Sequence, residues 1–184
     1  MKNIKCGLFL GILLWGSFSQ NAQAGQTGVS VGASYPTPMG NTYQTLGQKL
    51  GYQADFYLDS DFIKLSWMQL QFTALYQPFD VKNQPTLDFN RMGVFAGPQF
   101  INSTFGQGFS PFFTVQIGAV YDLLSFSGVA ATGNNAVNFA ASISPGFDLP
   151  IYGRFGIVGQ MPVQILFKSS TLMWSPSLSV RFKL

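Results

Sequence analysis

The chain has 184 residues, enough for one domain, and its ten basic and seven acidic side chains give a formal net charge of +3. Charged residues make up only 9% of the chain, against ~25% in ordinary soluble domains, whereas aromatic residues reach 16%. The chain has no histidine and a single cysteine, Cys6, which excludes a disulfide framework and Cys/His metal sites, and no basic patch indicates nucleic acid.

The first 24 residues have the pattern of a secretory signal peptide. Two lysines precede an apolar run at 8–15, and a polar stretch then ends in Ala22-Gln23-Ala24, the small-x-small pattern of a cleavage site. A membrane-anchoring helix is the alternative, but the run is too short to cross ~30 Å of hydrocarbon. We therefore predict a signal peptide at 1–24, which takes Cys6 with it, and a single domain at 25–184.

Alternation of apolar and polar residues dominates the rest of the chain, and it is typical of β-strands. In 50–58, for example, Tyr52 and Phe56 alternate with Gln53 and Asp55. Most of these segments are as long as a tilted membrane strand of ~9–11 residues. The eight predicted strands are 28–35, 50–58, 67–76, 87–100, 112–123, 137–147, 154–167 and 174–184.

The charged side chains indicate which face meets lipid. After residue 24, eight of them share the polar face of a strand and five lie in turns, while only Lys64 and Asp88 take the apolar phase, both at strand ends. A Lys or Arg on the lipid face costs ~2–4 kcal/mol at mid-depth. The sequence therefore predicts an all-β fold, an eight-stranded antiparallel up-and-down transmembrane β-barrel. The alternative is a soluble secreted barrel of the lipocalin or avidin kind, which binds lipid and points its apolar face inward.

An even strand number places both termini on the periplasmic side of such a barrel. The connections at 36–45, 77–86, 124–135 and 168–173 then face outward, and those at 59–61, 102–110 and 148–153 face the periplasm. The outward loops are short.

Hairpin arithmetic predicts a network of ion pairs inside the barrel. A lone charge in a narrow lumen is costly, so such charges need partners. The structural interpretation, a network that holds the barrel shut, is favoured over a selectivity ring because an eight-strand interior is only just wide enough for its own side chains. The predicted pairs are Arg91 with Asp122, Asp148 with Arg154, and Asp55 with Arg181.

With its last strand, Ser177–Leu184, the chain resembles the small outer-membrane barrels of the OmpA, OmpX and OmpW type. In that family the C-terminal strand is a signal for the barrel assembly machinery. The resemblance implies this role for Val180, Phe182 and Leu184, although the family usually ends in Phe. It also implies periplasmic chaperones during biogenesis, contact with outer-membrane lipid and lipopolysaccharide, and a monomer.

Catalysis is not expected. Outer-membrane phospholipases, lipid A deacylases and palmitoyltransferases resemble one another in using histidine for catalysis. This chain has no histidine. Seven scattered aspartates give no metal-ligand spacing, so we predict no catalytic, cofactor or metal site. The leading hypothesis is a non-catalytic barrel with a structural or envelope-integrity role in the outer membrane. The alternative is a narrow transporter that passes a small solute through the lumen or an apolar ligand sideways into lipid.

Overall fold

The structure is a computed structural model that describes residues 27–40, 45–59, 67–84, 86–102, 108–126, 129–130, 136–168 and 171–184. The predicted signal peptide at 1–24 and Lys64 lie outside these residues. Among the residues that are described, none belongs to a helix long and apolar enough to cross a membrane.

Every element in the described part of the chain is a β-strand, and all pairings are antiparallel. The strands are β1 (Gly28–Ser34), β2 (Thr37–Pro38), β3 (Leu46–Gln48), β4 (Gly51–Leu58), β5 (Met68–Val81), β6 (Leu87–Ile101), β7 (Ser110–Phe126), β8 (Val129–Ala130), β9 (Ala136–Tyr152), β10 (Phe155–Gln160), β11 (Val163–Leu166), β12 (Thr171–Trp174) and β13 (Ser177–Lys183).

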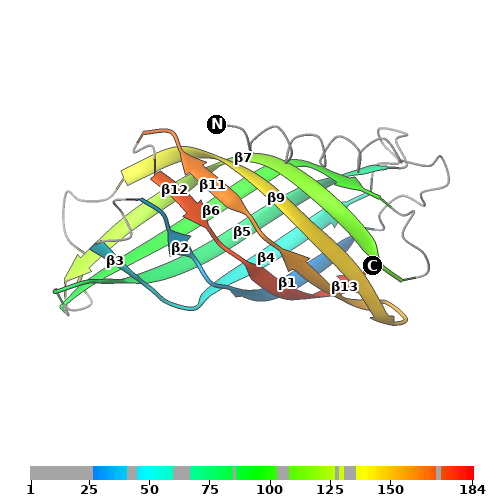
Figure 1. Ribbon diagram of the computed structural model, residues 1–184, viewed down its shortest axis with the longest axis horizontal. Helices are drawn as coiled ribbons and strands as arrows, with labels where there is room; N and C mark the ends of the chain where they lie inside the picture. Colours follow the sequence, from blue (N-terminus) through cyan, green and yellow to red (C-terminus); the bar gives the residue numbers. More distant parts are fainter. Residues whose placement is uncertain are drawn as a thin grey trace, which may run out of the picture.

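The sheet closes on itself to form an eight-stranded barrel (Figure 1). The first strand pairs with the last, from Gly28 opposite Lys183 to Ser34 opposite Ser177. Four short elements continue a longer neighbour, so that β1–β2, β3–β4, β10–β11 and β12–β13 each make one wall strand, and the short β8 adds to β7. The closed barrel confirms the predicted all-β fold and strand number.

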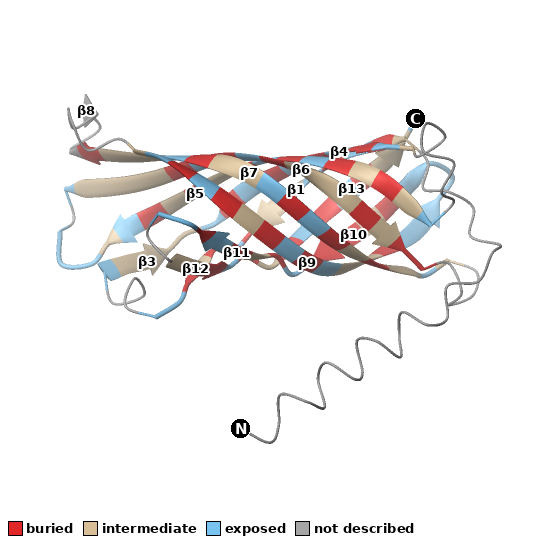
Figure 2. Cartoon of the chain, turned by 90° about the horizontal axis from the view of Figure 1, so that it is seen from above, coloured by how far each residue is buried: buried red, intermediate tan, exposed pale blue. Residues whose placement is uncertain are grey.

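Burial alternates along each strand as the sequence predicts, and Figure 2 shows this as alternating colours on the wall. In β4 the pattern is strict, with Gln53 and Asp55 buried and Tyr52 and Phe56 exposed. The outward-pointing side chains are apolar, as at Ile117, which is 71% exposed. Polar side chains are therefore inside and apolar ones outside, the arrangement of a membrane barrel and the reverse of a soluble one.

Four wall strands are longer than the predicted ~9–11 residues. β5, β6, β7 and β9 have 14, 15, 17 and 17 residues. They run diagonally to the long axis in Figure 1, and their ladder continues past the apolar band, up to the pairing of Leu87 with Phe126. The segment 77–86, predicted as an outward loop, therefore belongs to β5 as far as Val81.

Proline interrupts neighbouring strands on one side of the barrel, which the alternation did not predict. Pro36 separates β1 from β2, Pro162 separates β10 from β11, and Pro176 separates β12 from β13. Next to these breaks, three pairs of facing residues each contain one proline. A single backbone hydrogen bond joins each pair, because proline has no N–H to donate the second one. The bonds are Tyr35 N to Pro176 O, Ser175 N to Pro162 O, and Met161 N to Pro145 O, each 2.9 Å. We call Pro36, Pro145, Pro162 and Pro176 with these partners the proline seam.

Candidate functional site

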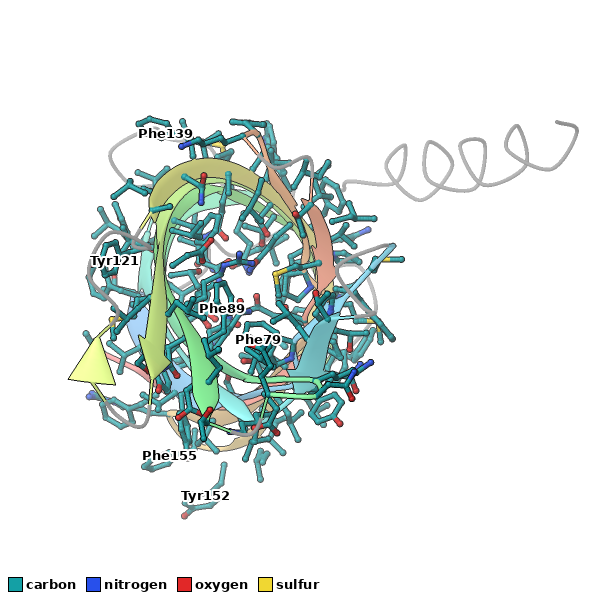
Figure 3. The ribbon with its side chains drawn as sticks, turned by 90° about the vertical axis from the view of Figure 1, so that its left-hand side faces the viewer. Phe79, Phe89, Tyr121, Phe139, Tyr152 and Phe155 are labelled. Carbon is teal, nitrogen blue, oxygen red and sulfur yellow. The ribbon has the colours of Figure 1, made fainter. Side chains whose placement is uncertain are left out.

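The candidate site is the barrel interior, where layers of polar and apolar side chains alternate along the axis. The layer nearest the β5–β6 turn contains Phe79 and Phe89, whose rings are 5.7 Å apart and lie within the mouth of the barrel in Figure 3. The Arg91 guanidinium lies 5.6 Å from the centroid of the Phe89 ring. This mouth is therefore narrowed by aromatic rings stacked against a cation.

Below the mouth, Arg91 on β6 and Asp122 on β7 form a two-point ion pair. Arg91 Nε donates to Oδ1 at 2.6 Å and Nη2 donates to Oδ2 at 2.9 Å. The two residues are register partners, as the hairpin arithmetic predicted. Asn138 Nδ2 adds a bond of 3.2 Å to the same carboxylate, and the sulfur of Met173 contacts the guanidinium. Both charges are thus neutralised inside the wall, with side-chain exposures of 5% and 13%.

An apolar layer lies inside the barrel between the Arg91–Asp122 pair and the polar residues that follow on the same strands. Leu75, Phe95, Val120, Ala140 and Leu166 form one cluster, and none of them is more than 7% exposed. They come from five neighbouring wall strands, β5, β6, β7, β9 and β11, and so they cover one continuous arc of the interior. Water and ions are poorly tolerated in such a layer.

Asp55 is the centre of the next polar layer. It is 3% exposed, and neutral side chains from three other strands, β1, β5 and β10, and from its own strand donate hydrogen bonds to it. Thr73 Oγ1 and Gln71 Nε2 donate to Oδ1 at 2.7 and 2.9 Å, and Ser30 Oγ donates to Oδ2 at 3.0 Å. Longer or shared bonds come from Gln53, Tyr57 and Gln160.

The predicted partner of Asp55, Arg181, does not reach it. Arg181 instead forms an ion pair with Asp148 and lies 5.8 Å from the centroid of the Tyr57 ring. The prediction of an Asp55–Arg181 pair is therefore wrong, because neutral donors surround the carboxylate and β9 supplies the arginine with another acid.

The predicted pair of Asp148 with Arg154 is also wrong. The arithmetic placed the β9–β10 turn at Ile151, but the turn lies between Tyr152 and Phe155, and the register shifts at a bulge next to it. Asp148 consequently faces Val158, and Arg154 is exposed at the hairpin tip. The structure thus brings together four of the six predicted interior charges in two pairs, leaves Asp55 without a cation and places Arg154 outside.

The glutamines that join the polar layer were not singled out by the sequence analysis. Gln71 Oε1 accepts from Thr114 Oγ1 at 3.1 Å and from Gln99 Nε2 at 3.3 Å, and Gln116 Nε2 donates to Thr73 Oγ1 at 3.0 Å. Their regular place on the polar phase of β5, β6 and β7 was the available signal. Nothing in the described chain groups three metal-ligating side chains.

The residues proposed as an assembly signal lie on the last strand. Val180 and Leu184 point outward with exposures of 59% and 62%, and the Phe182 ring packs against Phe155 at 5.2 Å. In the folded barrel these side chains face lipid. Nothing in the fold tests recognition during assembly, so this role stays a prediction.

Comparison with known proteins gives matches among solved structures alone. No protein-family model and no curated protein sequence matches the chain. Neisserial surface protein A (NspA) superposes with a TM-score of 0.61 at 12% identity over 88% of this chain and 99% of its own. The Ail protein of Yersinia pestis gives 0.56 at 12% identity, over 87% and 99%. The N-terminal β-barrel domain of Pseudomonas aeruginosa OprF gives 0.52 at 14% identity, over 87% and 100%.

These identities are low, so the likeness concerns the fold. A location in the outer membrane agrees with the outer surface of this barrel, because the exposed apolar side chains on every wall strand require lipid around them. The chain is therefore a small eight-stranded β-barrel of the outer-membrane type.

Proposed function

We propose that the protein is a non-catalytic barrel that strengthens the outer membrane and does not conduct through its lumen. The observation that carries this proposal is the apolar layer of Leu75, Phe95, Val120, Ala140 and Leu166, which lies between the two polar layers. An ion that crosses the lumen would leave water at this layer, at a cost of many kcal/mol. The interior ion pairs then act as ties between wall strands.

The lack of catalysis is argued from the side chains, since small outer-membrane barrels include enzymes such as PagL. The chain has no histidine, and its most buried carboxylate, Asp55, already accepts bonds from several neutral donors. A general base must have a lone pair free for the substrate proton. The barrel is proposed to be a monomer. Its proposed partners are lipid and lipopolysaccharide and, during biogenesis, chaperones and the assembly machinery.

Conductance across planar bilayers tests the closed lumen. We expect no openings from the wild-type protein. The variant Leu75→Ala/Phe95→Ala should conduct, because it removes two large side chains from the layer, whereas the matched outer-wall variant Val94→Ala should stay silent. Regular openings of the wild-type barrel would overturn the proposal of a closed lumen.

The envelope role needs a separate experiment in cells. Loss of the gene should raise the leakage of periplasmic enzymes and the sensitivity to SDS, and the wild-type and Ile143→Ala proteins should restore both. An unchanged barrier in cells that lack the protein would contradict the role.

Lateral passage of an apolar solute from the lumen into lipid is a second candidate function, and the proline seam favours it. Each seam pair has one ladder bond where two are normal, so this part of the wall opens at lower cost than the rest. A disulfide between Thr37→Cys and Trp174→Cys, which are register partners, should close the seam. If oxidation leaves the uptake of an apolar dye unchanged, as it should for the matched pair Val29→Cys/Phe182→Cys outside the seam, this candidate fails.

A further inference from the structure

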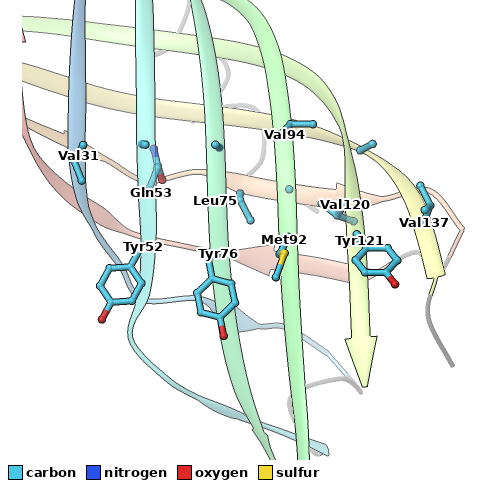
Figure 4. A pocket seen from close by; sticks show the side chains of 14 residues that line it. Val31, Tyr52, Gln53, Leu75, Tyr76, Met92, Val94, Val120, Tyr121 and Val137 are labelled. Carbon is cyan, nitrogen blue, oxygen red and sulfur yellow. The ribbon is translucent and has the colours of Figure 1, made fainter. Parts of the chain in front are cut away.

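A groove with a volume of about 560 Å³ lies on the outside of the barrel wall (Figure 4). It crosses the strands β1, β4, β5, β6, β7 and β9. Its floor is a register row of small side chains, Ala54, Ala74, Val94 and Ala119 on four adjacent strands. We call this the alanine groove.

The groove exists because the rows beside the floor carry large side chains. The next row toward the β5–β6 turn contains Tyr52, Tyr76, Met92 and Tyr121, again in register. In Figure 4 the three tyrosine rings form one row along an edge of the pocket, with Met92 between Tyr76 and Tyr121. One row beyond the floor on the other side, on β4 and β5 only, Phe56 and Phe72 form a ring pair with centroids 6.3 Å apart. Neighbouring strands are ~4.8 Å apart, so the small side chains of the floor leave a trough beside the row of large ones.

The surroundings of the groove indicate what occupies it. Its floor residues Ala54, Ala74 and Val94 are exposed, and no charged side chain lines it. In a barrel of the outer-membrane type this face meets hydrocarbon. The tyrosine edge is the side of the groove toward the β5–β6 turn and β3. In Figure 1 these elements lie at the barrel end opposite the C-terminus, the end that faces outward in this architecture.

The tyrosine edge also supplies polar atoms at one side of an apolar trough. Tyr76 is partly buried, and its hydroxyl donates to Asn90 Oδ1 at 2.8 Å. Tyrosine rings prefer the depth at which hydrocarbon gives way to headgroups. The groove is thus amphipathic, with its polar edge toward the outward headgroups and its apolar floor toward the bilayer centre.

We propose that the alanine groove binds one acyl chain of lipopolysaccharide, with the polar end of that lipid at the tyrosine hydroxyls. Lipopolysaccharide is the lipid of the outward leaflet, into which the polar edge of the groove points. Transfer of a chain from bulk lipid to the groove gains no hydrophobic free energy. The preference comes from van der Waals contact on a concave surface and from hydrogen bonds at the tyrosines.

Filling the groove tests the proposal. Folded protein in nanodiscs that contain lipopolysaccharide and phosphatidylethanolamine is released into the gas phase, and the lipid that stays bound is identified by mass. The wild type should retain one lipopolysaccharide molecule. Ala74→Phe, which fills the floor, should lower this retention roughly tenfold, which corresponds to the loss of about ten carbon–carbon contacts between the chain and the groove. Ala141→Phe is the matched control, since it adds the same ring to the lipid face of β9 outside the groove.

A crosslink identifies the occupant in the membrane. A benzophenone amino acid that replaces Val94 should form an adduct with lipopolysaccharide, and the same probe at Ile143, outside the groove, should not do so above background. A phospholipid adduct, a crosslinked dimer of the barrel, or equal retention by wild type and Ala74→Phe would each overturn the proposal. All variants are compared as folded barrels, selected by their altered mobility in SDS gels before boiling.

Discussion

Arg91 and Asp122 face each other across β6 and β7 and join these strands from inside the barrel by two charge-assisted hydrogen bonds, of 2.6 and 2.9 Å. The pair lies directly above the apolar layer. If one partner is lost, the other remains inside the barrel as a charge without its counter-ion.

The first prediction follows from this pair. Arg91→Ala and Asp122→Ala should each lower the free energy of unfolding by about 3–5 kcal/mol, and the double variant should lose less than the sum, because it leaves no uncompensated charge. Urea titration of the barrel in lipid vesicles measures all three. Lys49→Ala is the control: its partners Asp80 and Asp88 are solvent-exposed, and the loss should be only about 0–1 kcal/mol. Additive losses at Arg91 and Asp122 would mean that the pair is not coupled.

The second prediction concerns Asp55. Asp55→Asn keeps the shape but replaces an accepting oxygen with an N–H group that faces the donors Thr73, Gln71 and Gln53. We expect a loss of about 1–3 kcal/mol in the same titration, since donors are left unsatisfied in the interior. Asp80→Asn makes the same change at an exposed side chain and should alter stability by less than about 0.5 kcal/mol. Equal stabilities of Asp55→Asn and wild type would show that the layer rearranges its hydrogen bonds without cost.

The third prediction separates the two arginines near the periplasmic end. Arg181→Ala removes the partner of buried Asp148 and should cost about 3–5 kcal/mol. Arg154→Ala changes an exposed side chain at the hairpin tip and should stay within about 0.5 kcal/mol. If Arg154→Ala were the more harmful substitution, the β9–β10 register described above would be wrong.

The contrast between these residues shows what the sequence determines in this fold. Alternation fixes the face of each residue, because a one-residue slip would turn every charge toward lipid. The Arg91–Asp122 pair was therefore predictable from one well-centred hairpin. Asp148 was placed on the correct face but given the wrong partner, because a single bulge beside the β9–β10 turn shifts the register.

The hydrogen bonds to Asp55 could not be predicted from any single hairpin. Its donors Ser30, Thr73 and Gln160 come from three different wall strands, and they meet only after the barrel closes with a particular stagger between strands. The proline seam escaped prediction for another reason. Pro162 and Pro176 fit the two-residue alternation. The interruption becomes visible only when the strands are paired, because these prolines have no N–H to donate to the neighbouring strand.

The last prediction uses the seam itself. In the structure Tyr35 N donates to Pro176 O, while Tyr35 O receives only a 3.5 Å bond from the Thr37 hydroxyl. Pro176→Ala supplies the N–H that could complete this pair. Its gain should exceed the ~0.4–1 kcal/mol that the greater freedom of the unfolded chain costs, since an unsatisfied carbonyl in lipid is expensive.

We therefore expect Pro176→Ala to raise the urea midpoint and to slow amide exchange at Tyr35 and Ser177. Pro150→Ala is the control, because Pro150 lies outside the seam, exposed on β9 near the β9–β10 turn, and its loss should leave only the unfavourable effect on the unfolded chain. A lower midpoint for Pro176→Ala than for wild type would mean that packing of the Pro176 ring stabilises the wall by more than the added hydrogen bond does. In that case the seam would be a tight joint and not a weak one, and lateral passage would lose its structural support.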